Sequence, residues 1–121
     1  MSDNWKQIKD FEMYEISNEG KVRRMFGDKE HILAPIKYKI KNGGWSYVYV
    51  MLFNGNKKQK LHISYAVAEY FKEDYDPILN VFHKDNNKEN CHVDNLYQKT
   101  REWCKENKVK FYGYRVRKNK N

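Results

Sequence analysis

Residues 80–96 read NVFHKDNNKENCHVDNL and place two histidines, one cysteine, two aspartates and several asparagines in one short polar segment. Imidazole, carboxylate and amide groups at this density are typical of a metal-dependent active site. The residue before His83, however, is Phe82, whose side chain has no atom that can bind a metal. The segment therefore leaves two alternatives, a working centre or one that has lost its metal.

The composition predicts one small domain. The chain has 121 residues, of which 40% are hydrophobic and 33% charged, so a core of modest size is expected. Aromatic residues make up 16% of the chain and include ten tyrosines, which suits a β-rich core that continues into a contact surface.

The charge is uneven along the chain. The formal net charge is +8, and most of the excess follows Cys104. The basic residues there are Lys105, Lys108, Lys110, Arg115, Arg117, Lys118 and Lys120, against the acid Glu106. This asymmetry indicates a polyanionic partner, most commonly nucleic acid, and the alternative is a solubilising tail.

The two cysteines and the N-terminus indicate the cellular setting. Cys91 and Cys104 form neither a disulfide framework nor the paired spacing of a structural zinc site, so a reduced environment is expected. The first residues, MSDNWKQIKD, are too polar for a signal peptide, and no apolar run approaches transmembrane length. We therefore expect a soluble, cytoplasmic protein.

The N-terminal half is expected to be β-rich. Residues 13–17 and 22–26 are β-prone and flank the turn Asn18-Glu19-Gly20, and residues 31–40 read as a further strand broken by Pro35. The strongest strand signal is WSYVYVMLF (45–53), which a hairpin turn joins to the return strand QKLHI (59–63).

The pattern then becomes helical. Ser64 is the expected cap of a helix that ends near Phe71. A short strand (78–83), the polar loop and a final helix capped by Thr100 follow, and residues 111–121 read as a strand or a disordered basic arm. The predicted fold class is α+β.

The N-terminal residues NWKQIKDFEMYEISNEGKVR resemble the NUMOD4 module of HNH homing endonucleases carried by phages and introns. The family pattern is W-K-x-I, then an aromatic residue, then Y-x-I/V-S-N-x-G-x-V. The matching positions are Trp5, Ile8, Tyr14, Ile16, Ser17, Asn18, Gly20 and Val22.

The stretch LHISYAVAEYF is similar to the next family element, a strand that enters a helix of the form H-R-L-V-A-x-x-F. Val67, Ala68 and Phe71 match this pattern. The family histidine falls on Ser64, and His62 lies two residues earlier, so we expect His62 to be a surface or half-buried residue.

Residues 80–96 are similar to the HNH signature D/N-H-x-D-G-N-K-x-N-N-x-x-x-N-L-x-W. The matches are His83, Asp85, Asn87, Lys88, Asn90, Asn95 and Leu96; the departures are Phe82, Asn86 for glycine, Cys91 for the second asparagine and Gln98 for tryptophan. The resemblance runs from about Trp5 to Asn107 and implies an N-terminal antiparallel β-meander, a helix and an HNH-type ββα unit. It divides the chain into a β-rich DNA-contact region (1–63), an HNH-like region (64–108) and a basic tail (109–121).

The resemblance also implies a mechanism, in which a divalent metal ion, Mg²⁺ or Mn²⁺, acts at the scissile phosphate and a histidine is the general base. Carried onto this chain, the base is His83 and the loop brace is Asn87, while Asp85 is a candidate ligand or a cap of backbone amides. The two family ligand positions fall on Phe82 and Cys104. Phenylalanine has no donor atom and cysteine is a poor ligand for a hard cation, so both expected ligands are missing.

Two other interpretations of the loop are open. His83, Cys91, His92 and Cys104 could form a zinc site, although they lack the paired spacing of structural zinc sites. Alternatively, the aspartates and asparagines simply satisfy the hydrogen bonds of a tight turn.

The expected DNA contacts are basic residues of the β-rich region and the tail. Lysines alternate along residues 37–41, which would place positive charge on one face of a ribbon and suit a phosphate track. Tyr38, Trp45, Tyr47 and Tyr49 lie among them and either stack on bases or belong to the core. The expected set is Arg23, Arg24, Lys37, Lys39, Lys41, Lys57, Lys58, Lys60, Arg115 and Arg117.

These patterns together predict a double-stranded DNA-binding protein of HNH homing endonuclease descent whose cleavage centre is degraded. It would act as an accessory protein of a phage or mobile element in the host cytoplasm. Two alternatives stand beside it. One is an active metal-dependent nicking endonuclease with His83 as general base, and the other is a protein-binding inhibitor of a host factor.

Overall fold

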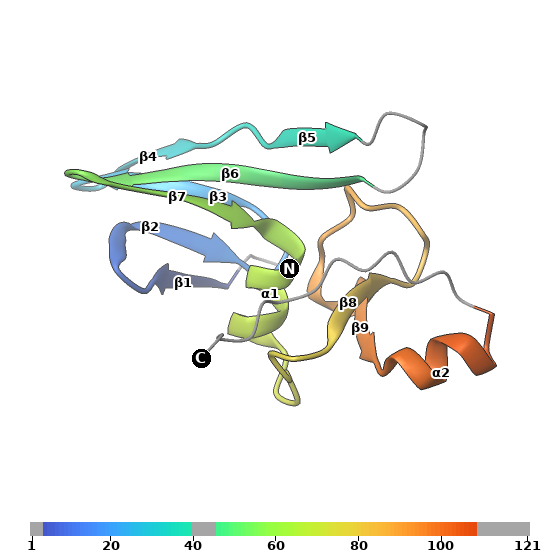
Figure 1. The fold of residues 1–121 in the computed structure, drawn as a ribbon. Helices are drawn as coiled ribbons and strands as arrows, with labels where there is room; N and C mark the ends of the chain where they lie inside the picture. The colour runs from blue at the N-terminus through green and yellow to red at the C-terminus, as the bar shows by residue number, and fades with distance from the viewer. Residues whose placement is uncertain (1–3, 40–45, 109–121) are drawn as a thin grey trace.

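A computed structural model describes residues 4–39 and 46–108 of the chain (Figure 1). Within these residues the chain forms two antiparallel sheets, then helix α1 (Ile63–Phe71), and then a two-stranded ribbon followed by helix α2 (Arg101–Glu106). The α+β class that the sequence predicts is confirmed.

The first sheet holds the NUMOD4-like residues. Its strands β1 (Trp5–Ile8), β2 (Phe11–Ser17), β3 (Val22–Phe26) and β4 (Lys29–Ile32) lie in chain order. The predicted turn joins β2 to β3, and Gly20 in that turn has a φ of +88°, a conformation that glycine adopts at no steric cost.

Residues 31–39 do not form one broken strand, because residues 31–32 lie in the first sheet and residues 36–39 in the second. Strand β4 ends at Ile32, and β5 (Ile36–Lys39) begins directly after Pro35 in the second sheet. Proline has no backbone N–H and cannot continue a hydrogen-bonded ladder, so the chain leaves the first sheet before it.

The second sheet is formed by β5, β6 (Ser46–Asn54) and β7 (Lys57–His62), in that order. Along β6, the side chains of Val48, Val50 and Leu52 are buried, whereas the alternate residues are more exposed. This period of two gives the sheet one core face and one outer face.

Helix α1 follows β7 without a loop, and the predicted cap at Ser64 was wrong. His62 is in the N-cap position and makes no side-chain cap bond, while Ser64 is buried within the helix. Since the strand runs as far as His62, the helix begins one residue before the serine, at Ile63.

The C-terminal part is a ββα unit. Strand β8 (Asn80–His83) pairs antiparallel with β9 (Leu96–Lys99), and a 3₁₀ turn, η1 (Val93–Asn95), precedes β9. The predicted cap of α2 is confirmed, because Thr100 Oγ1 accepts a hydrogen bond from Trp103 N at 3.0 Å.

One hydrophobic core joins the three parts. It contains Ile16 from the first sheet, Leu52 from the second, Val67 from α1 and Leu96 from β9, all buried. Figure 1 shows α1 between the first sheet and the β8–β9 ribbon. The ribbon that carries His83 is therefore packed on the same core as both sheets.

None of the helices in the described part of the chain has the length and apolar character needed to cross a bilayer.

Candidate functional site

His83 is the last residue of strand β8, and its side chain is buried in the protein. It pairs with Leu96 of β9, and only 8% of its surface is exposed. Burial lowers the pKa of His83 to about 4, Lys88 acts in the same direction, and Asp85 opposes both. The ring is therefore neutral at pH 7, and its buried Nε2 has no hydrogen-bond partner among the described residues. A neutral imidazole has one nitrogen without a proton, and that nitrogen can accept a proton, as a general base must.

The loop after His83 is organised by one carboxylate. Asp85 accepts hydrogen bonds from Asn87 N, Asn90 Nδ2 and Asn95 Nδ2, each at 2.9 Å. These bonds lower the pKa of Asp85 to about 2, with the Asn90 amide contributing most. Both carboxylate oxygens are engaged within the loop, so Asp85 acts as its central acceptor.

Three asparagines complete the loop. Asn87 Oδ1 accepts from Glu89 N at 3.0 Å, which is the kind of local bond expected of a brace. Asn95 Nδ2 also donates to Asn90 O at 2.8 Å. Asn86 has a φ of +62°, and it stands where the family pattern has glycine. Asparagine is among the side chains best tolerated in that conformation, which explains how the loop keeps its shape without the glycine.

The two family ligand positions lie in an aromatic cluster. Phe82 is paired with Tyr97 across the ribbon, with ring centroids 5.5 Å apart, and Tyr97 meets Trp103 edge-on at 6.2 Å. Cys104 is fully buried, and burial raises the pKa of its thiol. Cys104 also lies close enough to Tyr97 to contribute, after burial, to the raised pKa of that phenol.

The proposed zinc ligands do not converge. Cys91 Sγ donates to Lys88 O at 3.6 Å, and burial raises the pKa of this thiol to about 12. His92 Nδ1 accepts from Asp94 N at 3.1 Å. No group of three histidine, cysteine, aspartate or glutamate side chains within residues 4–39 and 46–108 could hold a metal ion. The zinc interpretation is therefore not supported.

The NUMOD4-like turn packs on the loop that follows His83. Asn18 O accepts a hydrogen bond from Val93 N at 2.9 Å. A Cβ added to Gly20 would lie 2.7 Å from Cys91 Cβ and 3.3 Å from the backbone carbonyl of Cys91, so there is no room for a side chain between the turn and the loop. Ser17 Oγ holds the turn by accepting from Glu19 N and Lys21 N. The motif could be seen in the sequence, but the distant partners of Asn18 and Gly20, Val93 and Cys91, could not.

The structure gives the two arginines of β3 partners within the protein. Arg23 forms ion pairs with Glu15 at 2.6 Å and Glu30 at 2.8 Å, and its guanidinium lies 3.9 Å from the centre of the Trp5 ring. Arg24 lies over the ring of Phe26 at 4.9 Å. The charge of Arg23 is therefore already balanced by two carboxylates, whereas Arg24 has ring contacts and its buried Nε has no hydrogen-bond partner among the described residues. Both arginines stay predicted DNA contacts, and Arg24 is the stronger candidate.

The lysines do not share one face. Lys58 and Lys60 pair with Phe53 and Met51, on the outer face of the second sheet, whereas Lys37 pairs with Val48, on the core face. Lys57 is opposite Asn54 and so also points away from Lys58. The register sends the hairpin lysines to both sides of β7. The predicted alternation along residues 37–41 stays a prediction, because only the side chain of Lys37 lies within the described residues. The side chain of Lys39 and the whole of Lys41, Trp45, Arg115 and Arg117 lie outside the described residues.

Known proteins resemble this chain in sequence and in structure. Residues 3–53 match the NUMOD4 motif family. The DNA endonuclease I-HmuI of Bacillus phage SP01 is 35% identical over 106 residues, which are 87% of this chain and 57% of that protein. An uncharacterized HNH endonuclease, L247 of Acanthamoeba polyphaga mimivirus, is 35% identical over 101 residues, 83% of this chain and 22% of the relative.

A solved structure has a similar fold. The HNH homing endonuclease I-HmuI, in a study of its DNA binding and cleavage, superposes with a TM-score of 0.68 at 34% identity, over 88% of this chain and 57% of that one. The chain carries the NUMOD4 motif and is similar over most of its length to HNH homing endonucleases. It spans little more than half the length of I-HmuI and about a fifth of L247.

The residues at the HNH ligand positions of this chain do not fit a magnesium site. Mg²⁺ prefers hard oxygen ligands in octahedral geometry. The positions that should supply them hold a phenyl ring and a protonated, buried thiol, and Asp85 is already occupied by three hydrogen bonds.

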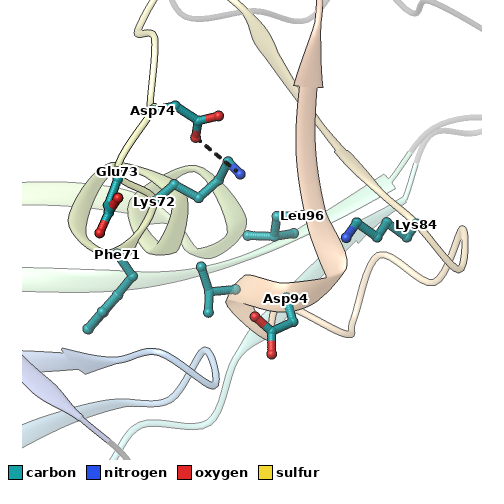
Figure 2. A pocket seen from close by; sticks show the side chains of 8 residues that line it. Phe71, Lys72, Glu73, Asp74, Lys84, Asp94 and Leu96 are labelled. Carbon is teal, nitrogen blue, oxygen red and sulfur yellow. Dashed lines mark ion pairs between the residues drawn. The ribbon is translucent and has the colours of Figure 1, made fainter.

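An open cavity of about 620 Å³ lies near the end of α1, next to η1 and β9 (Figure 2). It is lined by Phe71, Lys72, Glu73, Asp74, Lys84, Val93, Asp94 and Leu96. Lys72 forms an ion pair with Asp74 at 3.4 Å, drawn as a dashed line in Figure 2. His83 is not among the residues that line this cavity, and the lining carries both positive and negative side chains. The cavity is therefore separate from the site of the candidate base.

Proposed function

We propose that this chain binds double-stranded DNA on the scaffold of an HNH homing endonuclease and has lost the metal-dependent cleavage of that family. Its descent and its net charge of +8 support DNA as the partner. I-HmuI binds and cleaves DNA according to the structural study of that protein, and we extend only the binding to this chain.

The main support for the proposed loss of cleavage is the cluster of Phe82, Tyr97, Trp103 and Cys104 at the family ligand positions. A metal ion in such a site stabilises the charge that develops on the phosphate and on the leaving oxygen. His83 can accept a proton from water, but a base alone does not stabilise that charge. The base is retained, and the groups that would place a cation beside it are replaced by rings and a thiol.

The phosphate contacts of the proposed complex come from exposed lysines. Lys57 and Lys58 are exposed on β7, and Lys37 is exposed on β5, where its ion pair with Glu89 is solvent-accessible on both sides. Such exposed pairs contribute little and exchange readily for a phosphate. The other proposed contacts are Arg23, Arg24, Lys39, Lys41, Lys60, Arg115 and Arg117.

Salt dependence tests the binding. We expect the affinity for a duplex oligonucleotide to fall by about 10- to 1,000-fold between 50 and 200 mM salt, because phosphate contacts release counterions. Fluorescence anisotropy with a labelled duplex measures this. An affinity that stays constant over that range would contradict the DNA-binding proposal.

A plasmid-nicking assay tests the loss of cleavage. In Mg²⁺ or Mn²⁺ we expect the wild type and His83→Ala to give the same background. The variant with Phe82→Asp and Cys104→Asn restores the family ligand types, and it should gain nicking that His83→Ala abolishes. Nicking by the wild type that depends on His83 would instead establish the active nicking endonuclease.

We also propose that the protein acts in the cytoplasm of an infected or invaded host, as the product of a phage or mobile element. The support is the source of its relatives, a Bacillus phage and a giant virus. Fractionation of infected cells with an antibody to the chain tests this location.

A further inference from the structure

The second sheet has an outer face that is rich in aromatic and aliphatic side chains. The strand register places on it Ile36, Tyr38, Tyr47, Tyr49, Met51, Phe53, Lys58, Lys60 and His62. Three of these are large apolar side chains left well exposed, with Tyr38 at 47% and Phe53 at 48%.

The rings on this face form a row across the three strands. The centroids of Tyr38 and Tyr47 are 5.1 Å apart, and Tyr47 is stacked on His62 at 4.5 Å with an interplanar angle of 15°. His62 in turn meets Tyr65 edge-on at 4.7 Å. Tyr38, on the edge strand β5, ends the row and is its most exposed ring.

The row leads from the sheet edge to the histidine site. Tyr65 Oη accepts from Val81 N at 3.1 Å, in the strand that carries His83. Burial, and then His83, lower the pKa of His62, so the two imidazoles are electrostatic neighbours. A ligand strand lying along the row would therefore approach the loop of the ββα unit.

The charge of this face favours a polyanion. Lys60 Nζ lies 4.5 Å from the centre of the Tyr49 ring, and Lys58 is exposed beside Phe53. Among the described residues of the face there is no acid. The outer face of the first sheet differs, because Glu15 and Glu30 there neutralise Arg23.

The side-chain types favour unstacked bases over the grooves of a duplex. Base edges in a groove are read by hydrogen-bonding groups such as guanidinium and amide, and the described residues of this face include no arginine, asparagine or glutamine. Aromatic rings stack on the π-face of a base, which is accessible only when the base has left its stack.

We propose that the outer face of the second sheet binds the bases of single-stranded DNA, with Tyr38 as the principal stacking ring and Lys58 and Lys60 beside the phosphates. This inference rests on the proposed DNA binding and assigns to the same protein a second substrate form, as would be exposed at a nick or a melted site.

A wild-type comparison tests it without any mutation. An oligo(dT) strand and a strand of the same length made of abasic nucleotides carry the same phosphates, but only the first has bases. We expect the full chain to bind oligo(dT) about 5- to 150-fold more tightly, the range for one stacked base. Equal affinities would overturn the inference, because binding would then depend on phosphates alone.

Variants locate the site. Tyr38→Ala should lose about 5- to 150-fold in affinity for oligo(dT), while Tyr38→Phe keeps the ring and should stay within about twofold of wild type. Phe26→Ala is the matched control, because Phe26 is an exposed aromatic residue on the first sheet, at 53% exposure. If Phe26→Ala weakens binding as much as Tyr38→Ala, or if Tyr38→Phe is as weak as Tyr38→Ala, stacking on Tyr38 is wrong.

Other outcomes separate this inference from the proposed function. Salt-dependent duplex binding without any base effect on single strands would leave the proposed function intact and overturn only the inference. A dimer in light scattering that Tyr38→Ala dissociates would make this face a contact between two copies, which also overturns it. Absence of binding to any DNA would overturn both.

Discussion

At position 20 the chain has no space for a side chain, and at the similar position 27 it does. Gly20 and Gly27 both have positive φ angles, +88° and +66°. A Cβ at Gly20 would lie 2.7 Å from Cys91 Cβ, whereas a Cβ at Gly27 would meet nothing within 4 Å. The pair therefore separates the cost of the backbone conformation from the cost of contact with the histidine-bearing loop.

We expect Gly27→Ala to lower the free energy of unfolding by about 1 kcal/mol, the cost of a positive φ for alanine. Gly20→Ala should lower it by about 2–4 kcal/mol, because the new methyl group must also displace the backbone at Cys91. Urea unfolding of both variants measures the difference. Equal decreases in the free energy of unfolding would mean that the turn at Gly20 is not in close contact with Cys91 in solution.

The neutral state of His83 makes a second prediction at this scale. The folded-state pKa is about 4, below the ordinary value of 6.5, so between these pH values the unfolded chain binds more protons than the folded one. The free energy of unfolding should therefore rise with pH through this window, and His83 should account for about 1–3 kcal/mol of the rise. Above pH 6.5 both states are neutral at this position and the contribution is complete.

His83→Gln should flatten the increase between pH 4 and 6.5, as measured by urea unfolding at several pH values. His62 titrates lower in the folded protein for the same main reason, burial, so the variant with both His62→Gln and His83→Gln should be flatter still. A slope in His83→Gln as steep as in the wild type would show that His83 is accessible to protons in the folded state.

At the scale of elements, short helix α2 depends on its cap. The helix has six residues, fewer than an isolated helix needs, so its start must be held by tertiary contacts and by Thr100. Thr100 Oγ1 satisfies the N–H of Trp103, whose ring packs on Tyr97.

Thr100→Ala should cost about 1 kcal/mol of stability, and Thr100→Ser should cost much less because serine keeps the acceptor. Backbone amide exchange of residues 101–106 should rise in the alanine variant. If serine and alanine destabilise equally, the methyl packing of Thr100 matters more than its hydroxyl.

The strands show which local patterns were sufficient for prediction. The β6–β7 hairpin, the turn before β3 and the cap of α2 follow from alternation, turn residues and a hydroxyl, all of which act within a few residues. The assignment of strands to sheets could not be predicted from the sequence. Strands β4 and β5 flank Pro35 but belong to different sheets, and only long-range packing decides which sheet each strand joins.

At the scale of the molecule, one core runs through the regions 1–63 and 64–108. Helix α1 contacts strands of both sheets and of the ββα unit, and Tyr14 Oη accepts from Phe53 N at 3.2 Å to join the two sheets directly. We therefore propose that these two regions fold as one cooperative unit.

Leu96→Ala tests this, because Leu96 is buried in the ribbon but belongs to the common core. The cavity should cost about 2–5 kcal/mol, and amide exchange in β6 and in β8 should accelerate together. Faster exchange confined to β8, β9 and α2 would mean that the ββα unit unfolds by itself.

The sequence by itself determined the resemblance to HNH homing endonucleases, the α+β class and the candidate base, because these depend on residue types at fixed spacings along the chain. It also identified Phe82 and Cys104 as unsuitable metal ligands, since donor chemistry belongs to the side chain alone. Only the tertiary structure decided which charges are available: it paired Arg23 with Glu15 and Glu30 and divided the lysines between two faces. It alone brought the NUMOD4 turn against the loop of residues 80–96 and aligned Tyr38, Tyr47 and His62 in one row, because strand register and core packing act between residues that are distant in sequence.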